Sequence, residues 1–248
     1  MQTHVLPNPN ALADAVAGLI ADCVRDKPAS VLCLAGGDTP RAAYARLVEM
    51  QRAGEVDLSQ VIYVGLDEWV GLPADYPGSC RAFMQETVFG PLAVPPERIV
   101  FYDAMADDLQ AECRRVDAFL SARGPLDLVL LGMGMNGHLG MNEPGCTLDS
   151  GSIVTELDPV TVSVGQKYFG TQQPVLKQGI TLGIGSIMQA HLAVLMVSGG
   201  KKAATVAGAL QGDIGNRLPA SLLRTHGNAI AMLDADAAQQ LDLTRPLP

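Results

Sequence analysis

Apolar positions along the chain alternate between helical and strand-like spacing. Helical spacing is seen for Leu12, Val16, Leu19 and Cys23, after Pro40, across residues 79–90 and 109–119, and in the segment that ends near Leu210. Between these segments lie short apolar runs at Val31–Leu34, Val61–Leu66, Ile99–Tyr102, Leu126–Leu131, Ile180–Ile184, Leu192–Val197 and Ala229–Leu233. Strands without polar alternation are buried on both faces, as in parallel sheets that helices cover. The pattern therefore predicts an α/β fold with a doubly wound, mostly parallel sheet and helices on both faces, formed by residues 1–248 as a single domain.

Composition and charge narrow the class of protein and of partner. The chain has 248 residues, of which 48% are hydrophobic and 17% are charged, and this is typical of a globular protein. Its net charge of −9 opposes binding to phosphate backbones and anionic membranes, so we expect neither nucleic acid nor a membrane as a partner. No apolar run approaches the roughly 20 residues that span a bilayer, and the N-terminus lacks a signal-peptide pattern. We expect a cytoplasmic protein.

The cysteines predict neither a disulfide framework nor a structural zinc site. Five cysteines are scattered along the chain, and no two of them have C-x-x-C spacing. An odd number of widely spaced cysteines is typical of a protein from a reducing compartment.

Ligands of doubly wound sheets bind beyond the carboxyl ends of the strands, so the loops that follow the strands are the candidates for chemistry. The first loop, residues 35–40, contains Gly36, Gly37, Asp38 and Thr39 directly before a predicted helix. Glycines let backbone N–H groups face an anion, and the start of a helix adds partial positive charge. This loop is either a phosphate cradle or an ordinary strand-to-helix turn.

Two adjacent carboxylates, Asp67 and Glu68, follow the second buried run. Neighbouring side chains of an extended segment point to opposite sides, so only one of the two can face a cleft. A carboxylate at the rim of an apolar sheet can act as a base, because partial burial raises its pKa. The alternative role for such a residue is a helix cap or a salt bridge.

The loop after the most apolar run is the strongest candidate for a catalytic site. Residues 131–145 are rich in glycine and bring together Asn136, His138, Asn142 and Glu143. A carboxylate five residues after a histidine can orient its imidazole for proton transfer. The loop also contains a G-x-G-x-x-G pattern, but Asn-Glu-Pro follows where a dinucleotide site needs a helix. We therefore interpret the loop as catalytic and not as an NAD site.

A fourth loop, Ser198–Lys202, again places a glycine pair and lysines before a predicted helix. A lysine at a helix N-terminus opposes the helix dipole, which indicates that an anion binds nearby. The alternative is a pair of solvated lysines.

In this order, the four loops resemble those of the glucosamine-6-phosphate deaminase/isomerase family, and the resemblance covers nearly the whole chain. The most specific motifs are Leu66–Pro73 (LDEWVGLP) and Asn136–Pro144 (NGHLGMNEP). The Asp-Glu-Trp sequence and Pro77–Cys80 look most like the galactosamine-6-phosphate isomerase/deaminase branch. The related 6-phosphogluconolactonases share the first glycine loop and a Gly-His element, but they carry Asp-Glu-Arg and lack Asn-Glu-Pro.

The resemblance implies an isomerase/deaminase that converts galactosamine 6-phosphate or glucosamine 6-phosphate to a ketose 6-phosphate and ammonia, without a metal or an organic cofactor. His138 would relay the proton that opens the sugar ring, while Glu143 and Asn136 orient its imidazole. Asp67 would move a proton between C2 and C1. The phosphate would be held by Gly36–Thr39, Lys167 and Lys201.

Three positions depart from the family pattern. Asn136 stands where many members carry Asp, which removes one charge from the ring-opening relay. Lys167 stands where well-studied members use Arg, which gives up a bidentate phosphate contact. The stretch Ser152–Thr155 lacks the basic residues with which hexameric members bind an allosteric sugar phosphate, so we expect no such activation.

Two other functions stay open at this point: a lactonase on the same scaffold, and a sugar-phosphate sensor without turnover. Asn-Glu-Pro and Trp69 argue against the lactonase. The joint presence of Asp67, His138 and Glu143 argues against the sensor, because binding alone would not require all three. The expected partner is a small phosphorylated amino sugar. Whether the chain forms a homo-oligomer stays open, because the family includes monomers, trimers and hexamers.

Overall fold

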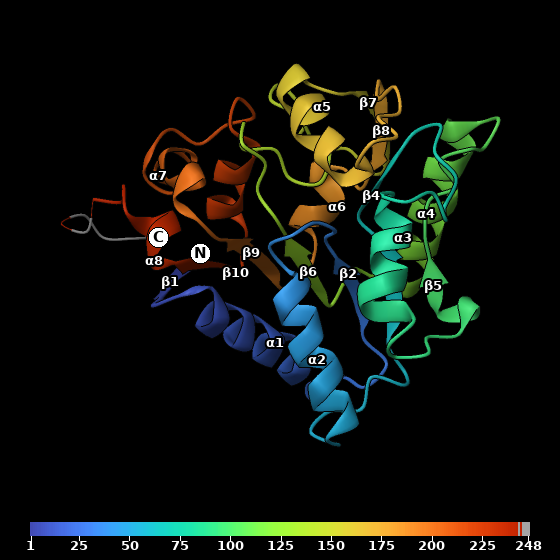
Figure 1. Cartoon of the computed structure of the whole chain (residues 1–248), viewed down its shortest axis with the longest axis horizontal. Helices are drawn as coiled ribbons and strands as arrows, with labels where there is room; N and C mark the ends of the chain where they lie inside the picture. Colours follow the sequence, from blue (N-terminus) through green and yellow to red (C-terminus); the bar gives the residue numbers. More distant parts are fainter. Residues whose placement is uncertain (243, 245–248) are drawn as a thin grey trace.

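The computed structural model describes residues 1–242 and 244, and in this part of the chain seven parallel strands form one sheet. The strands are β1 (Gln2–Leu6), β2 (Val31–Leu34), β3 (Ile62–Gly65), β5 (Ile99–Val100), β6 (Leu128–Leu131), β9 (Ala193–Val197) and β10 (Ala229–Asp234). Their order across the sheet is β1-β10-β9-β6-β2-β3-β5 (Figure 1). The predicted parallel sheet is confirmed. The hydrophobic pattern did not indicate β1, because this edge strand is largely exposed and carries polar side chains.

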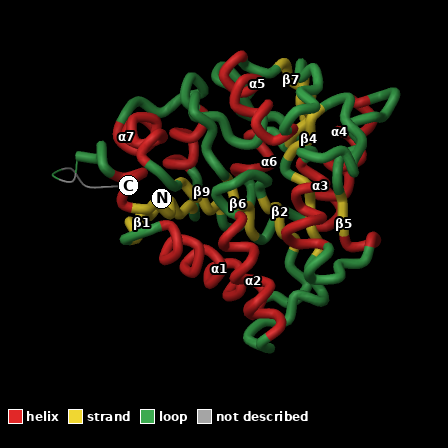
Figure 2. The backbone as a smooth tube through the Cα atoms, in the orientation of Figure 1, coloured by secondary structure: helices red, strands yellow, loops and turns green. Residues whose placement is uncertain are grey.

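Helices cover both faces of the sheet (Figure 2). They are α1 (Pro9–Asp26), α2 (Arg41–Arg52), α3 (Cys80–Met84), α4 (Leu109–Arg123), α5 (Pro159–Gly165), α6 (Ile184–Met188), α7 (Ala203–Gln211) and α8 (Ala235–Ala238). On one face, Leu12 of α1 and Tyr44 of α2 pack in the same cluster as Leu32 of β2. On the other face, Val116 of α4 packs in the same cluster as Cys33. Adjacent residues of β2 therefore pack into two separate hydrophobic cores, one on each face of the sheet, as a doubly wound sheet requires.

A second, antiparallel sheet of three strands lies beside the main one within the described residues, in the order β4-β8-β7. Its strands are β4 (Asp67–Trp69), β7 (Ile153–Glu156) and β8 (Gln178–Thr181). The sequence analysis was wrong about Ile180–Ile184, which it placed as a strand of the parallel sheet. The strand ends at Thr181 and pairs antiparallel with β4 and β7, and Ile184 begins α6. An apolar run shows that a segment is buried, but it does not show which sheet the segment joins.

Shorter helical turns connect these elements. They are a π-helical turn at Gln85–Phe89 and 3₁₀ turns at Pro96–Arg98, Gln166–Phe169, Gly200–Lys202 and Pro219–Thr225. The helix predicted over residues 79–90 is therefore α3 continued by a π turn, and it ends at Phe89. Among the described residues, no helix combines the length and the apolarity that crossing a membrane requires.

Strands β3, β2, β6 and β9 are neighbours in the sheet, in that order. Because parallel strands end at the same edge, the loops that follow them also meet there. These are residues 66–73, 35–40, 132–145 and 198–202, the four segments that the sequence analysis selected.

Candidate active site

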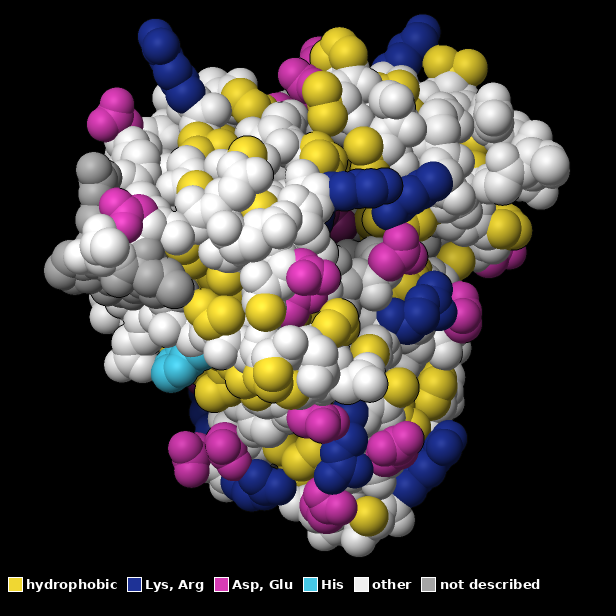
Figure 3. Space-filling model, turned by 60° about the vertical axis from the view of Figure 1, so that its left-hand side comes forward, with side chains coloured by type: hydrophobic (Ala, Val, Ile, Leu, Met, Phe, Trp, Pro, Cys, Tyr) yellow, Lys and Arg dark blue, Asp and Glu magenta, His cyan; other side chains and the backbone are white. Residues whose placement is uncertain are grey.

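The four loops surround a cavity of about 1200 Å³ at the carboxyl edge of the sheet. Figure 3 shows a hollow on this molecule's surface with Lys and Arg side chains at its rim. The segment that contains α5 and the 3₁₀ turn after it forms another part of the cavity wall. It contributes Thr161, Lys167 and Tyr168.

Of the residues predicted for the site, all line the cavity except Asn136, Asn142 and Glu143. Asn136 and Glu143 contact His138, which lines it. Asn142 is fully buried, and its side chain donates to the backbone carbonyls of Leu139 and Leu182, so it has a structural role.

The adjacent carboxylates of β4 point to opposite sides, as predicted. Asp67 lines the cavity, whereas Glu68 is buried behind it and is 1% exposed. Glu68 accepts hydrogen bonds from the backbone N–H groups of Trp69 at 2.8 Å, Cys80 at 2.9 Å and Arg81 at 2.8 Å. It therefore caps the start of α3 and ties this helix to β4. Burial raises the pKa of Glu68 to about 7, although these backbone hydrogen bonds oppose the rise.

Asp67 is a buried carboxylate whose surroundings favour the uptake of a proton. Burial raises its pKa, while a hydrogen bond from the Cys80 side chain and the charge of His138 oppose the rise. The thiol of Cys80 is itself kept protonated, because burial and the charge of Asp67 raise its pKa well above its ordinary value. A base with a raised pKa accepts a proton more readily than an ordinary aspartate.

The loop after β6 holds a hydrogen-bonded group around His138. The Nδ1 atom of His138 lies 3.3 Å from Oε2 of Glu143 and 3.0 Å from Oγ1 of Thr161. Nδ2 of Asn136 donates to the same Glu143 oxygen at 2.9 Å, and Oδ1 of Asn136 accepts from the backbone N–H of His138 at 3.2 Å. Burial raises the pKa of Glu143, but hydrogen bonds from His138, Thr161 and Asn136 outweigh it and lower the pKa to about 2. Glu143 is therefore a fixed negative charge behind the imidazole.

Glycine is required in this loop for two separate reasons. A Cβ on Gly134 would lie 2.3 Å from the imidazole ring of His138, so the ring needs the open space at this position. Gly137 has a φ of +83°, a conformation that side chains rarely adopt. No helix follows the loop directly; the chain makes a bridge between Leu139 and Asn142 instead. The formal G-x-G-x-x-G match therefore lacks the helix on which a dinucleotide phosphate would sit.

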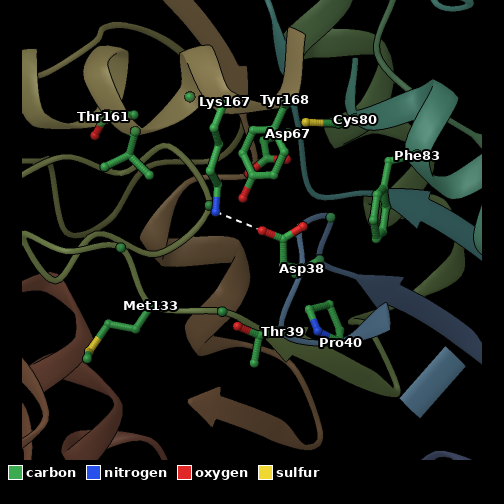
Figure 4. Close-up of a pocket in the computed structure, with 18 of the residues that line it drawn as sticks. Asp38, Thr39, Pro40, Asp67, Cys80, Phe83, Met133, Thr161, Lys167 and Tyr168 are labelled. Atoms are coloured by element: carbon green, nitrogen blue, oxygen red, sulfur yellow. Dashed lines mark hydrogen bonds and ion pairs between the residues drawn. The ribbon is translucent and has the colours of Figure 1, made fainter. Parts of the chain in front are cut away.

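The opposite end of the cavity carries the groups suited to a phosphate. Nζ of Lys167 lies 2.8 Å from Oδ2 of Asp38, across the mouth of the cavity (Figure 4). Thr39 and Gly37 stand beside this pair, and Gly37 has a φ of +109° that suits its turn. The predicted phosphate loop is thus in the cavity wall. However, the carboxylate of Asp38 in this loop offsets the positive charge of Lys167.

Lys202, which the sequence analysis included in the fourth loop but did not select as a phosphate ligand, reaches further into the cavity than Lys201. Nζ of Lys202 donates to the backbone carbonyl of Met133, on the loop after β6, whereas Lys201 is exposed at the rim. Burial lowers the pKa of Lys202, and the nearby charge of Lys167 lowers it further. Two lysines in succession at the start of a helix point in different directions. That rule indicates that only one of them faces the site, but not which one.

A buried carboxylate behind the phosphate end was also missed. Asp234, at the end of β10, is 1% exposed and accepts hydrogen bonds from the Ser198 hydroxyl and the backbone N–H of Gly199. It also caps α8 through Ala237 N–H at 2.8 Å. It therefore fixes the loop that leads to Lys202.

The described residues contain no group of three or more His, Cys, Asp or Glu side chains placed to hold a metal ion. Asp67 and His138 line the cavity with groups that can exchange protons, and Lys167 and Lys202 line it with two ammonium groups that can bind an anion.

Comparison with known proteins identifies relatives of this chain. Residues 8–231 match the family described as glucosamine-6-phosphate isomerases/6-phosphogluconolactonase. A glucosamine-6-phosphate deaminase of Rhodopirellula baltica is 37% identical over 98% of this chain and 96% of its own length. Another, from Thermoanaerobacter sp. (strain X514), is 34% identical over 96% of this chain and 94% of its own length.

Solved structures agree with the sequence relatives. A monomeric glucosamine-6-phosphate deaminase superposes with a TM-score of 0.93 at 34% identity, covering 96% of this chain and 99% of its own. The 6-phosphogluconolactonase of Trypanosoma brucei superposes with a TM-score of 0.75 at 23% identity, covering 97% and 98% of the two chains, and this likeness shows the fold alone. The chain therefore belongs to the glucosamine-6-phosphate isomerase/6-phosphogluconolactonase family.

Proposed function

We propose that this chain is a glucosamine-6-phosphate deaminase, which converts the amino sugar and water to a ketose 6-phosphate and ammonia. The observation that supports this most is one cavity with a proton-exchanging carboxylate, Asp67, at one end and two lysine ammonium groups at the other. The relatives named as glucosamine-6-phosphate deaminases match nearly the whole chain. Because both sheets contribute to this cavity, the proposal treats residues 1–248 as one catalytic unit.

The proposed first step opens the sugar ring. His138 takes the proton of the C1 hydroxyl and returns a proton to the ring oxygen, while the bond between C1 and the ring oxygen breaks. Glu143 stays ionised across neutral pH, because its pKa is about 2, and it holds the proton of the imidazole on Nδ1. The Nε2 atom of His138 is then available as the proton relay. Asn136 and Thr161 are positioning residues that fix Glu143 and the ring.

The proposed second step moves a proton between the two carbons that react. Asp67 removes the proton from C2 of the open-chain aldehyde, and the C1 oxygen takes a proton from solvent, which gives an enolamine; the later hydrolysis of the iminium group returns one proton to solvent. Asp67 then delivers its proton to C1, and the electron pair of the enolamine forms an iminium group at C2. Water adds to C2 and ammonia leaves, so the product carries a carbonyl at C2. The raised pKa of Asp67 suits both directions of transfer.

The phosphate end binds and orients the substrate. In the proposal, Lys202 and Lys167 contact the phosphate together with the loop Gly36–Thr39, and Lys201 takes a place at the rim. Phosphate has to compete with the carboxylate of Asp38 for Lys167, because the two side chains already form an ion pair.

Glucosamine 6-phosphate is the proposed substrate in preference to galactosamine 6-phosphate. The Asp-Glu-Trp sequence favours the galactosamine branch, but the relatives that match this chain over its length are named for glucosamine 6-phosphate. The lactonase alternative has weaker support, since three lactonases that superpose on the chain are 23%, 18% and 21% identical to it.

The test is ammonia release from glucosamine 6-phosphate and from galactosamine 6-phosphate, with hydrolysis of 6-phosphogluconolactone measured alongside. We expect ammonia from glucosamine 6-phosphate and a large loss of kcat in the Glu143→Gln variant, which keeps the shape but removes the charge behind His138. Lactone hydrolysis without ammonia would contradict the proposal. Binding of the sugar phosphates without turnover of any of the three would favour a sensor.

A further inference from the structure

The two ends of the cavity fix where each part of a hexosamine 6-phosphate would lie. Lys167 and Lys202 mark the phosphate on C6, and Asp67 marks the reacting carbons C1 and C2. C4 is two bonds from C6, so its hydroxyl lies nearer to the phosphate than the reacting carbons do. A side chain placed between the two ends, close to the lysines, would face this hydroxyl.

Tyr168 occupies that place. Its ring stands between Lys167 and Cys80 (Figure 4), and the ammonium of Lys167 lies 4.7 Å from the ring centre. The Tyr168 hydroxyl approaches the glycine loop so closely that a Cβ on Gly37 would lie 3.3 Å from it. The side chain is half-buried and lines the cavity, with Asp67 behind it in the same view.

The Tyr168 hydroxyl can donate a hydrogen bond to a ligand. Burial raises the pKa of this phenol, although the charge of Lys167 opposes the rise, so the group keeps its proton at neutral pH. A lysine ammonium can only donate, so the phenol oxygen can accept from the neighbouring Lys167 while its O–H donates to a ligand. Three other hydroxyls of the wall have protein partners: Ser79 donates to the carbonyl of Ala74, Thr161 contacts His138, and Ser198 bonds to Asp234.

We propose that Tyr168 is a specificity-determining residue whose hydroxyl recognises the C4 hydroxyl of the bound amino sugar. Glucosamine 6-phosphate and galactosamine 6-phosphate differ only in the direction of this hydroxyl. A single fixed donor can meet it in one epimer and not in the other. The inference rests on the proposed function, because it requires that a hexosamine 6-phosphate occupies the cavity.

The test compares Tyr168→Phe, which removes only the hydroxyl, with the wild type on three substrates. These are glucosamine 6-phosphate, galactosamine 6-phosphate and 4-deoxyglucosamine 6-phosphate. We expect kcat/KM for the preferred epimer to fall about tenfold and kcat/KM for the other epimer to fall less than about twofold. If glucosamine 6-phosphate is the preferred epimer, kcat/KM for the deoxy sugar should also fall less than about twofold. The matched control is Tyr76→Phe, which removes a hydroxyl from the same aromatic cluster, at a tyrosine that does not line the cavity.

The inhibition constant of inorganic phosphate separates recognition of the sugar from a change at Lys167. We expect it to stay within about twofold in Tyr168→Phe. A rise that parallels the loss of kcat/KM would overturn the inference, because the hydroxyl would then act through Lys167. Equal losses on both epimers, or no loss on either, would overturn it while leaving the deaminase proposal intact. A wild type that releases ammonia from neither sugar would overturn both.

Discussion

The reaction end and the phosphate end of the cavity are built in different ways. At the reaction end, His138, Glu143 and Asn136 come from one loop and bond to one another, and the side chains of His138 and Glu143 are 18% and 10% exposed. At the phosphate end, the ion pair joins Lys167 and Asp38, which are 129 residues apart, with side chains 50% and 66% exposed. The group around His138 is preorganised mainly by local sequence, whereas the Lys167–Asp38 pair is assembled from distant segments and shares its charges with solvent.

This difference predicts that substitutions at the two ends change different kinetic constants. A buried group whose charge is held by several hydrogen bonds acts on the transition state, so its loss should lower kcat. An exposed ion pair contributes at most about 1 kcal/mol and is screened by salt. Changes at the phosphate end should therefore act mainly on KM, and their size should depend on how deeply the altered charge is buried.

The largest effect is expected at Asp67. The Asp67→Asn variant keeps the shape of the side chain but cannot accept a proton from C2, so kcat should fall by about a thousandfold or more. The measurement is ammonia release at saturating substrate, with KM determined in parallel. A variant that retained more than a tenth of the wild-type kcat would remove Asp67 from the mechanism. The matched control is Glu68→Gln, which alters the neighbouring carboxylate outside the cavity and should leave kcat within a few-fold.

The next effect sharpens the distinction between the two lysines. Lys202→Ala removes the ammonium that lies inside the cavity, so KM should rise about 10- to 100-fold with a smaller change in kcat. Lys201→Ala removes the exposed ammonium at the rim and should raise KM less than about threefold. Both are measured by steady-state kinetics at fixed ionic strength. Equal effects of the two substitutions would contradict the assignment of Lys202 as the inner ligand.

The third prediction concerns pH and the thiol beside the base. If only ionised Asp67 removes the proton from C2, kcat/KM rises as the pH increases through the pKa of Asp67. The hydrogen bond from Cys80 holds this pKa down against the effect of burial, so Cys80→Ala should raise the pKa further. The acidic limb of the pH profile should then move to higher pH by about half a pH unit to one pH unit. Cys80→Ser keeps a hydrogen-bond donor beside Asp67 and should move the acidic limb less. A shift of the limb to lower pH in Cys80→Ala would contradict the role of Cys80 as a donor to Asp67.

The smallest effect is expected at Asp38, where it tests the competition at the phosphate end. Asp38→Asn removes the carboxylate that pairs with Lys167, so KM and the inhibition constant of inorganic phosphate should both fall about two- to fivefold. Glu86→Gln is the control, because it also removes a negative charge from the cavity wall but pairs with Arg41. A rise in KM for Asp38→Asn would mean that the carboxylate positions Lys167 for phosphate and does not compete with it.

The sequence predicted the reaction end well, because the relevant information is local. The alternation rule placed only one of Asp67 and Glu68 in the cleft, and the structure places Asp67 there. The glycine-rich loop after β6 gathers His138 and Glu143 within a few residues, and short-range geometry is enough to bring them together. Uninterrupted apolar runs likewise predicted the buried parallel strands, since burial on both faces leaves no room for polar alternation.

Only the tertiary structure decided which strands and charged side chains that lie far apart in the chain contact each other. Hydrophobic runs could not assign β8 to the small antiparallel sheet, because pairing partners do not appear in the pattern of a single segment. They could not choose Lys202 over Lys201 or bring Asp38 to Lys167, since these depend on how separate loops approach at the sheet edge. By itself, the sequence determined which segments are buried and which loops line the cavity, because periodicity and glycine placement are local. The folded chain decided which charges meet, because electrostatic contacts depend on distance in space and not on position in the chain.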